Sequence, residues 1–510
     1  MVKKGKLIIN LDEVIGNINP NIYGHFAEHI GELIYPGIWV GEDSKIPNIE
    51  GIRKDLVEAL KKIRPPVIRW PGGCFADAYH WMDGIGPREE RPIRVSFWGD
   101  EETNQFGTDE FLKFCSMVGA EPYICLNVGS GSPEEARSWV EYCNYSGNSY
   151  YAQLRAKNGH PEPYRVKYWG VGNENWGCGG CFTPREYASE YRRFANFIKG
   201  FCVPFSEWGK IELIACGHTE REWNRILMES LRDYLYLVDH LSIHYYFHAY
   251  GGDIKFSDED YFNLLLSIQQ LEYHIWQAIT VVDHFAEQRK NIGIVVDEWG
   301  VWYPEANLKS KFRQQNTLRD AILAASVLNL FNRYCRKVVM ANISQLVNVL
   351  QALFLTEGSK LIVTPTYHVF DMYKYHMAND ALKAEISSPI IKEPPSPPKP
   401  FFVSIPLRKL KPLAALDASV SINRERKELV ITLVNRSLDE EVETEILLRG
   451  DREMEDGRKI ILTASDVREF NDFDAPERVK PSEETIRARD KGFVYMAPPH
   501  SVNTLIVKLK

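Results

Sequence analysis

The stretch IGIVVDEWG, residues 292–300, is a short apolar run that closes on an acidic pair, Asp297-Glu298. It is apolar on both faces rather than alternating, which is typical of a parallel strand buried on both sides. KYWGVGNE, residues 167–174, has the same character and also ends on a glutamate, Glu174. Six further runs of this kind lie on either side of these two: NIYGHF (21–26), PVIRWPGG (66–73), PYICLNVG (122–129), ELIACG (212–217), HLSIHYY (240–246) and VVMANISQ (338–345).

Amphipathic helical stretches separate the eight predicted strands. Ser132-Pro133-Glu134-Glu135 and Thr183-Pro184-Arg185-Glu186 both read as capping boxes with proline at the first helical position. Eight units of strand followed by helix predict an α/β fold, a (β/α)8 TIM barrel over residues 18–381. A doubly wound sheet is the alternative, but no GxGxxG motif follows the first strand to support it.

The pattern changes after residue 381. Five prolines between 394 and 400 predict a stiff surface loop, which a barrel helix would not contain. Short strands follow, and in the last of them Leu505, Val507 and Leu509 alternate with Ile506, Lys508 and Lys510, which is typical of a half-buried antiparallel strand. We expect residues 382–510 to form an antiparallel, jelly-roll-like β-sandwich, with a strand from residues 1–17 completing it.

Composition narrows the possible partners and the compartment. The 510 residues carry 61 bases against 69 acids, a net charge of −8, which argues against nucleic-acid binding. No stretch approaches the roughly 20 apolar residues of a membrane helix, and Asp12 and Glu13 interrupt the region where a signal peptide needs an apolar run. Nine scattered cysteines do not form the framework of a secreted disulfide-rich protein. We therefore predict a cytoplasmic protein that binds no nucleic acid and no membrane.

The two glutamates stand where a TIM barrel carries its active site. Catalytic residues of this fold lie at the carboxyl ends of the strands, and Glu174 and Glu298 end predicted strands four and seven. Glycoside hydrolysis needs such a pair: one carboxyl protonates the leaving oxygen, and the other attacks the anomeric carbon or activates water. An Asn-Glu or an Asp-Glu dipeptide alone would indicate only a surface carboxylate, but the shared position of Glu174 and Glu298 at the mouth of the barrel favours catalysis.

Seven motifs extend this interpretation over essentially the whole chain. They are IYGHFAEHIG (22–31), RWPGGCFADAYHW (69–81), QFGTDEF (105–111), WGVGNENWGCGG (169–180), SIHYY (242–246), VVDEWGVWY (295–303) and NISQLVNVLQ (342–351). Together they resemble the α-L-arabinofuranosidases of glycoside hydrolase family 51. A generic barrel would not share several of these motifs.

The resemblance implies roles for the residues around the acidic motifs. Glu174 would be the general acid/base and Glu298 the nucleophile of a retaining reaction, for which the carboxyl groups lie about 5–5.5 Å apart. Asn173 would bond the sugar hydroxyl next to the anomeric carbon. Arg69, at the end of strand two, would neutralise and orient the nucleophile through bidentate contacts that lysine cannot copy.

The resemblance also implies which side chains hold the sugar. Positions that bind the furanose ring, or where a further sugar contact is expected, are matched by Glu28, Cys74, Tyr246 and Gln345. Trp98 and Trp302 resemble aromatic walls that stack on the sugar and the neighbouring chain, with ordinary packing as the alternative. His244 would orient groups near Tyr246 or be a structural histidine.

Some features depart from the commonest family pattern. Gly300 stands where many relatives have asparagine, and the stretch from Tyr303 to Phe312 is short for a loop that often forms a lid. These departures leave open the preference for the aglycone. Cys178 and Cys181 form a CxxC motif, for which we expect a local disulfide or two free thiols. A redox or zinc site is disfavoured because no second CxxC or paired-histidine motif accompanies it.

Together these observations predict an intracellular, exo-acting α-L-arabinofuranosidase that releases terminal arabinofuranosyl units from oligosaccharides or polysaccharides by double displacement. No metal or organic cofactor is implied, because two carboxylates supply the chemistry. The resemblance implies a homo-oligomer, with a hexamer favoured. One alternative keeps the mechanism with another sugar, as in a β-xylosidase or endoglucanase of the same barrel clan. A second alternative is a catalytically silent carbohydrate-binding protein.

Overall fold

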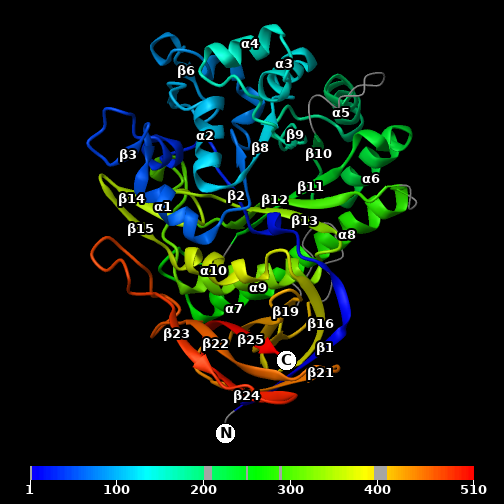
Figure 1. Cartoon of the computed structure of the whole chain (residues 1–510), viewed down its shortest axis with the longest axis vertical. Coiled ribbons are helices and arrows are strands. Elements are labelled where there is room, and N and C mark those ends of the chain that lie inside the picture. The colour runs from blue at the N-terminus through cyan, green and yellow to red at the C-terminus, as the bar shows by residue number, and fades with distance from the viewer. Residues whose placement is uncertain (1–2, 200–209, 249–250, 287–289, 395–409) are drawn as a thin grey trace, which may run out of the picture.

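The computed structural model describes residues 3–199, 210–248, 251–286, 290–394 and 410–510. A barrel and a C-terminal sheet lie at opposite ends of the molecule, with helices α7, α9 and α10 between them (Figure 1). None of the helices in these ranges is long and apolar enough to cross a membrane.

Eight parallel strands form the closed barrel and confirm the eight predicted runs. Hydrogen bonding joins them in the order in which they occur along the chain, and the last strand pairs with the first. The strands are β2 (Gly24–Phe26), β5 (Val67–Trp70), β8 (Glu121–Leu126), β9 (Tyr168–Val171), β10 (Glu212–Ala215), β11 (His240–Phe247), β12 (Gly293–Val301) and β13 (Val338–Ile343). A layer of buried side chains, one from each of six strands, fills the interior: Val67, Tyr123, Tyr168, Ile214, Val295 and Met340. The interior is therefore a packed core, and a ligand must bind at its rim.

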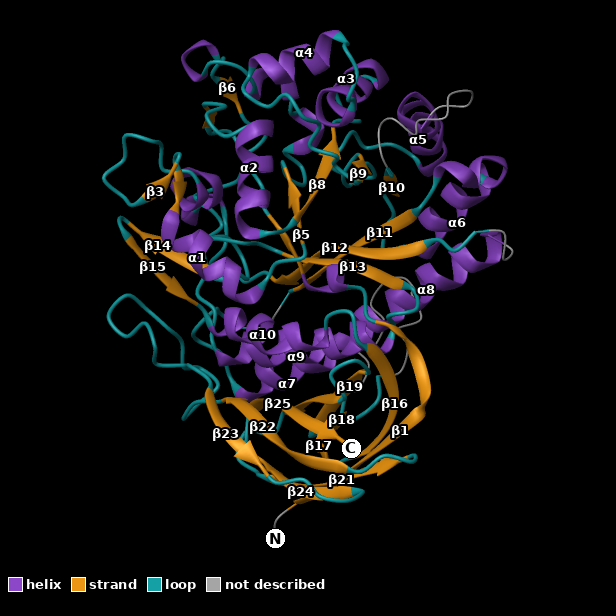
Figure 2. Cartoon of the chain, in the orientation of Figure 1, coloured by secondary structure: helices purple, strands orange, loops and turns teal. Residues whose placement is uncertain are grey.

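Helices surround this barrel, as Figure 2 shows. They are α1 (Lys54–Ile63), α2 (Thr108–Val118), α3 (Pro133–Asn144), α4 (Tyr150–Lys157), α5 (Pro184–Lys199), α6 (Arg221–Ser230), α7 (Asp258–Leu266), α8 (Ile268–Ala286), α9 (Leu318–Arg333) and α10 (Pro365–Tyr373). The predicted capping box at Thr183 is present: Glu186 accepts a bond from the Thr183 N–H at 2.8 Å, and its own N–H donates to the Thr183 hydroxyl at 3.4 Å. At Ser132 only half of the predicted box forms: the hydroxyl accepts a bond from the Glu135 N–H at 3.1 Å, while the Glu135 carboxylate bonds His80. Each cap satisfies backbone groups that the first helical turn leaves unpaired.

The C-terminal part is one continuous nine-stranded sheet that curls around its own core. Its order is β23 (Ser482–Ile486), β22 (Met454–Leu462), β25 (Ser501–Leu509), β20 (Glu428–Asn435), β19 (Leu416–Asn423), β16 (Asp380–Ser387), β1 (Lys3–Asn17), β21 (Val442–Arg449) and β24 (Gly492–Ala497). The N-terminal strand β1 joins this sheet, pairing antiparallel with β16 and parallel with β21. Leu7 and Ile9 of β1 share the enclosed core with Leu505 and Val507 of β25. Most of the predicted proline-rich loop lies outside the described residues.

Short two-stranded ribbons complete the strand inventory. They are β3 (Asn48–Ile49) with β4 (Ile52–Arg53), β6 (Arg94–Val95) with β7 (Glu101–Glu102), β14 (Phe354–Glu357) with β15 (Lys360–Val363), and β17 (Ile390–Lys392) with β18 (Leu413–Ala414). The β6–β7 and β14–β15 ribbons belong to connections that follow barrel strands β5 and β13, so both stand on the catalytic side of the barrel.

Helix α9 connects the barrel to the sheet and is buried over almost its whole length. Two of its asparagines reach the sheet: Asn332 Nδ2 donates to the Ser419 hydroxyl at 3.0 Å, and that hydroxyl donates to Asn329 Oδ1 at 2.7 Å. Nearby, His376 is fully buried between the hydroxyls of Ser421, at 2.8 Å, and Thr432, at 2.7 Å. Polar groups at this junction are thus paired with one another rather than with water.

Burial of His376 makes stability depend on pH. Burial lowers its pKa to about 3 in the folded protein, whereas the unfolded chain carries a histidine with a pKa of about 6.5. Between these values only the unfolded chain takes up the proton, so stability falls as the pH falls from 6.5 towards 3. We expect His376→Gln to flatten the slope of unfolding free energy between pH 4.5 and 6 by about 1.4 kcal/mol per pH unit. Denaturant titrations at several pH values measure that slope, and equal slopes in variant and wild type would contradict the assignment.

Candidate active site

The two predicted glutamates meet at the carboxyl end of the barrel. Glu298 lies within β12, and Glu174 lies three residues beyond the end of β9. One carboxylate oxygen from each glutamate and a ring nitrogen of His244 all lie within 4.8 Å of one another. His244 Nδ1 is 2.9 Å from Glu174 Oε1 and 3.5 Å from Glu298 Oε1. His244 is the direct neighbour of Glu298 across the β11–β12 ladder, so the barrel register itself brings the two residues together.

Glu298 is held as a carboxylate by donors on both of its oxygens. Arg69 Nη1 donates to Oε1 at 2.8 Å, and the Tyr246 hydroxyl donates to Oε2 at 2.7 Å. Burial on its own raises the pKa of the Glu298 carboxyl, but the charges of His244 and Arg69 and these two hydrogen bonds outweigh it, and the pKa lies below its ordinary value. A buried, ionised carboxylate with fixed orientation is what a nucleophile needs.

The imidazole of His244 contacts both carboxylates, and their charges change its pKa. Burial alone would lower the pKa of its imidazole, but the negative charges of Glu298 and Glu174 and the hydrogen bond to Glu174 raise it above the ordinary value. A protonated ring donates through both nitrogens, and Nδ1 faces the two carboxylates. The orienting role predicted for His244 therefore concerns the glutamates more directly than Tyr246.

Asn173 links the second glutamate to the same charge network. Its Oδ1 accepts a bond from Arg69 Nη2 at 2.6 Å, and its side chain is buried. The next residue, Glu174, has a φ of +40°, in the left-handed region that non-glycine residues rarely adopt. Surrounding contacts must hold this conformation, since a free chain would leave it.

Glu28 and Gln345 form a second buried polar pair beside Glu298. Gln345 Nε2 donates to Glu28 Oε2 at 3.0 Å, and Glu28 Oε1 accepts bonds from the Phe75 N–H and from Trp98 Nε1, both at 3.2 Å. Burial and the charge of Glu298 raise the pKa of Glu28 to about 7. The pair follows adjacent strands β2 and β13, so the closure of the barrel brings together residues that are 317 positions apart.

The predicted aromatic walls stand at the rim of this cluster. Trp302 lies edge-on to Tyr246 with ring centroids 5.2 Å apart, and Trp98 hydrogen-bonds Glu28 as described. Both tryptophans are half-buried and pack against Phe312, at 5.1 Å from Trp98 and 6.0 Å from Trp302. Trp98 thus combines packing with a hydrogen bond to the polar cluster, whereas Trp302 Nε1 donates to the Ala306 carbonyl at 2.8 Å.

The cysteines pair differently from either expectation for the CxxC motif. Cys178 forms a disulfide with Cys74, across 104 residues, while Cys181 is an exposed free thiol. Cys178 lies in the turn after Glu174, which folds back over the loop after β5 and brings the Cα atoms of Cys74 and Cys178 to 5.5 Å. Cys181 is turned away, with its thiol hydrogen-bonded to the Gly177 carbonyl at 3.3 Å. The Cys74 sulfur has no S–H to donate, so a sugar contact there is restricted to the sulfur surface.

Asp77 is a functional candidate that sequence reasoning missed. It is buried, and it accepts bonds at 2.8 Å from three backbone N–H groups, those of Val128, Gly129 and Asn173. Asn175 Nδ2 adds a longer bond at 3.4 Å. Burial raises the pKa of Asp77 to about 7, against these hydrogen bonds. Asp77 thereby fixes the residues on both sides of Glu174, and its only signal in the sequence was its place in the 69–81 motif.

The described residues contain two groups of side chains close enough to hold a metal ion. One consists of Cys74, Glu174 and Cys178, whose sulfurs are tied up in the disulfide. The other is the Glu174, His244 and Glu298 cluster, where the Arg69 guanidinium already supplies a positive charge at 2.8 Å. The donor set therefore suits acid–base and nucleophilic chemistry better than metal binding.

A barrel that presents two carboxylates at this separation, one paired with arginine and tyrosine, belongs to the glycosidases. The profile described as α-L-arabinofuranosidase 1 domain matches residues 59–261, and the α-L-arabinofuranosidase C-terminal domain matches residues 297–501. The chain is 40% identical over 491 residues to an intracellular exo-α-L-arabinofuranosidase of Bacteroides ovatus, covering 94% of this chain and 91% of the relative.

Solved structures agree with these matches. The family 51 arabinofuranosidase of Xanthomonas axonopodis pv. citri superposes with a TM-score of 0.90 at 34% identity, covering 99% of this chain and 100% of that structure. An α-L-arabinofuranosidase of Thermotoga maritima in complex with arabinose gives 0.86 at 35% identity, covering 99% of both chains. The chain belongs to the α-L-arabinofuranosidases of glycoside hydrolase family 51.

We expect Asp77→Asn to impair turnover more than binding. The amide would turn a donor towards backbone N–H groups that need an acceptor, and the loop around Glu174 would lose its fixed position. A misplaced acid costs on the order of 10²-fold in rate, so kcat on nitrophenyl α-L-arabinofuranoside should fall by that order with a small change in KM. The matched control is Asp83→Asn, because Asp83 pairs with the exposed Arg94 away from the glutamates. A rise in KM with kcat unchanged would contradict the positioning role.

Proposed function

We propose that the protein is a retaining, exo-acting α-L-arabinofuranosidase that releases terminal non-reducing arabinofuranosyl residues from oligosaccharides or polysaccharides. The observation that carries the proposal is the approach of Glu174 and Glu298 to within 4.8 Å between carboxylate oxygens. Retaining glycosidases have carboxyl groups about 5–5.5 Å apart, whereas inverting enzymes need about 6.5–9.5 Å to admit a water molecule. The short separation leaves no room for that water.

The proposed reaction proceeds in two displacements. Glu298 Oε attacks the anomeric carbon while Glu174 gives its proton to the leaving oxygen, which departs as the alcohol of the aglycone. Glu174, now a carboxylate, takes a proton from an incoming water, and the hydroxide releases arabinose and restores the Glu298 carboxylate. Arg69 and Tyr246 orient Glu298, and His244 faces both glutamates while their charges change during the reaction.

The proposed sugar site is the polar cluster beside the glutamates. Asn173 would bond the hydroxyl next to the anomeric carbon, and the remaining ring contacts would come from Glu28, Cys74, Tyr246 and Gln345. Glu28 and Gln345 already bond each other, so their unused acceptors and donors are preoriented for a sugar hydroxyl. Trp98 and Trp302 would stack on the sugar and the adjoining chain.

We further propose a cytoplasmic homo-oligomer, with a hexamer favoured by family resemblance. The relative from Bacteroides ovatus is named intracellular, which supports this compartment, whereas the Cys74–Cys178 disulfide is a bond that a reducing cytoplasm disfavours. In this proposal residues 18–381 form the catalytic domain, and residues 1–17 and 382–510 form the sheet domain.

Two substitutions test the catalytic roles. Glu298→Ala should abolish turnover, since it removes the nucleophile. Glu174→Ala should lower kcat by about 10²–10⁴-fold on substrates with poor leaving groups and less on activated aryl arabinofuranosides. Added azide, which needs no general base, should restore part of the Glu174→Ala rate and yield arabinofuranosyl azide with retained configuration. Absence of any azide rescue would speak against Glu174 as the acid/base.

A substrate panel tests the sugar. Nitrophenyl α-L-arabinofuranoside should be hydrolysed with a higher kcat/KM than nitrophenyl β-xylopyranoside or nitrophenyl β-cellobioside. Preference for either of the latter would instead favour a β-xylosidase or an endoglucanase. Turnover that is absent on all three, with oligosaccharide binding retained, would identify a carbohydrate-binding protein.

A further inference from the structure

A long segment of the sheet domain packs against the catalytic side of the barrel. Residues 463–481 connect β22 to β23, and within them the backbone carbonyls of Val467 and Glu469 accept bonds from the first residues of α9, at 3.0 and 2.9 Å. Asn471 Nδ2 donates to the Val363 carbonyl of β15 at 3.0 Å. Connections of this length without regular structure are uncommon in compact domains and usually have a function.

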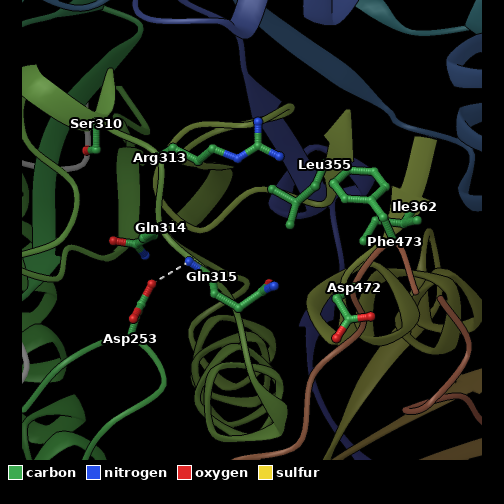
Figure 3. A pocket seen from close by; sticks show the side chains of 9 residues that line it. All are labelled: Asp253, Ser310, Arg313, Gln314, Gln315, Leu355, Ile362, Asp472 and Phe473. Atoms are coloured by element: carbon green, nitrogen blue, oxygen red, sulfur yellow. Dashed lines mark hydrogen bonds between the residues drawn. The ribbon is translucent and has the colours of Figure 1, made fainter. Parts of the chain in front are cut away.

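A pocket of about 410 Å³ lies where this segment meets three barrel connections, those that follow β11, β12 and β13 (Figure 3). Three side chains form its apolar wall, Leu355 and Ile362 of the β14–β15 ribbon and Phe473 of the 463–481 segment. The polar lining comes from both parts of the chain and consists of Asp253, Ser310, Arg313, Gln314, Gln315 and Asp472. In Figure 3 the guanidinium of Arg313, the side chain of Leu355 and the ring of Phe473 follow one another across the upper part of the view, with Asp253 and Asp472 below them.

The pocket adjoins the wall of the proposed active site. Phe312, which packs against both Trp98 and Trp302, is flanked along the chain by residues that line the pocket. The same short segment therefore supports the aromatic rim of the glutamate cluster and one side of the pocket. The rim and this second hollow are therefore joined through Phe312.

The chemistry of the pocket fits a neutral sugar ring. Phe473 is half-buried and offers a ring face for the C–H groups of a sugar. Asp253 Oδ2 accepts a bond from the Gln315 N–H at 2.7 Å, and Asp472 Oδ1 accepts from the Ala475 N–H at 2.7 Å. Carboxylate oxygens accept more than one bond, so both side chains are fixed in place and retain capacity for hydroxyl groups.

Charge argues against an anionic ligand. Two carboxylates, Asp253 and Asp472, line the pocket with one guanidinium, that of Arg313. Asp472 also pairs with Arg478 at 3.2 Å, and Arg313 lies 3.7 Å from Glu32. A phosphate or uronate would meet more negative than positive charge. The volume is near the lower end of the range for small-ligand sites, about 300–1,000 Å³, and suits one or two sugar rings.

We propose that this pocket is a second saccharide-binding site, which takes a neutral pentose or hexose unit of the substrate chain at a distance from the catalytic glutamates. The sheet domain would thus contribute to substrate binding through Phe473 and Asp472. The inference rests on the proposed function for the identity of the chain, and it concerns affinity for long substrates rather than the chemical step.

Kinetics on a short and a long substrate test the proposal. Phe473→Ala and Arg313→Ala should each raise KM for linear arabinohexaose about fivefold, the loss expected for one ring contact in the first variant and for one hydrogen bond in the second, with kcat unchanged. Both should leave kcat and KM on nitrophenyl α-L-arabinofuranoside unchanged, because that substrate ends at the rim. Asp474→Ala is the matched control, an exposed residue of the same segment that does not line the pocket. Thermal unfolding establishes that each variant is folded.

Binding to the inactive protein separates this proposal from the proposed function. In Glu298→Ala, titration calorimetry with arabinohexaose and with xylohexaose should show about fivefold weaker binding of at least one hexaose when Phe473→Ala is added. Unchanged KM and unchanged binding of both hexaoses in both pocket variants would overturn the inference, while hydrolysis of the aryl arabinofuranoside would leave the proposed function intact. Failure of the wild type to hydrolyse any arabinofuranoside would overturn the proposed function, and the binding titrations would still decide the pocket. A change of oligomeric state in Phe473→Ala or Arg313→Ala, with hexaose binding unchanged, would identify the pocket as a contact between subunits and overturn the inference.

Discussion

The buried guanidinium of Arg69 is the interaction on which the site depends. It has no exposed surface, and its three oxygen partners come from the ends of two other strands. It donates hydrogen bonds to Glu298 at 2.8 Å and to Asn173 at 2.6 Å, and it forms an ion pair with Asp297 at 3.5 Å. Taking an arginine and two carboxylates out of water is costly, and removing one partner leaves the others uncompensated. The burial of the guanidinium is therefore compensated because the barrel register places all three oxygen partners around it. A lysine would offer one point charge in place of this fork.

The eight strands could be predicted from the sequence because a strand buried on both faces leaves a continuous apolar run. The same runs end on the functional residues, so Glu174 and Glu298 could be assigned to the rim once the barrel was inferred. The N-terminal strand was also predictable, since LIINLD reads as a strand. The parallel pairing of this strand with β21 could not be predicted, because the register between distant strands is set by packing that the sequence of one segment does not reveal.

Contacts between distant loops account for what the sequence did not predict. The Cys74–Cys178 disulfide joins residues 104 positions apart, and the nearby Cys181 suggested a local pair instead. Asp77 is an ordinary residue type whose importance comes from three backbone N–H groups on two other loops. Neither the disulfide-bonded cysteine pair nor Asp77 has a local sequence pattern that distinguishes it. Likewise, the pocket beside Phe473 arises from four separate segments, and its residues carry no motif.

The surroundings of the two glutamates separate their roles. Glu298 is almost fully buried and contacts a permanent cation and a phenol, which favour its charged form. Glu174 is more exposed, contacts no arginine or lysine among the described residues, and shares only His244 with its partner. An acid/base must change its protonation state twice in each cycle, which a contact with arginine would hinder, whereas a nucleophile must remain ionised until it attacks. In the proposed mechanism, the position of Arg69 on one glutamate and not the other therefore distinguishes the carboxylate that attacks from the one that carries the proton.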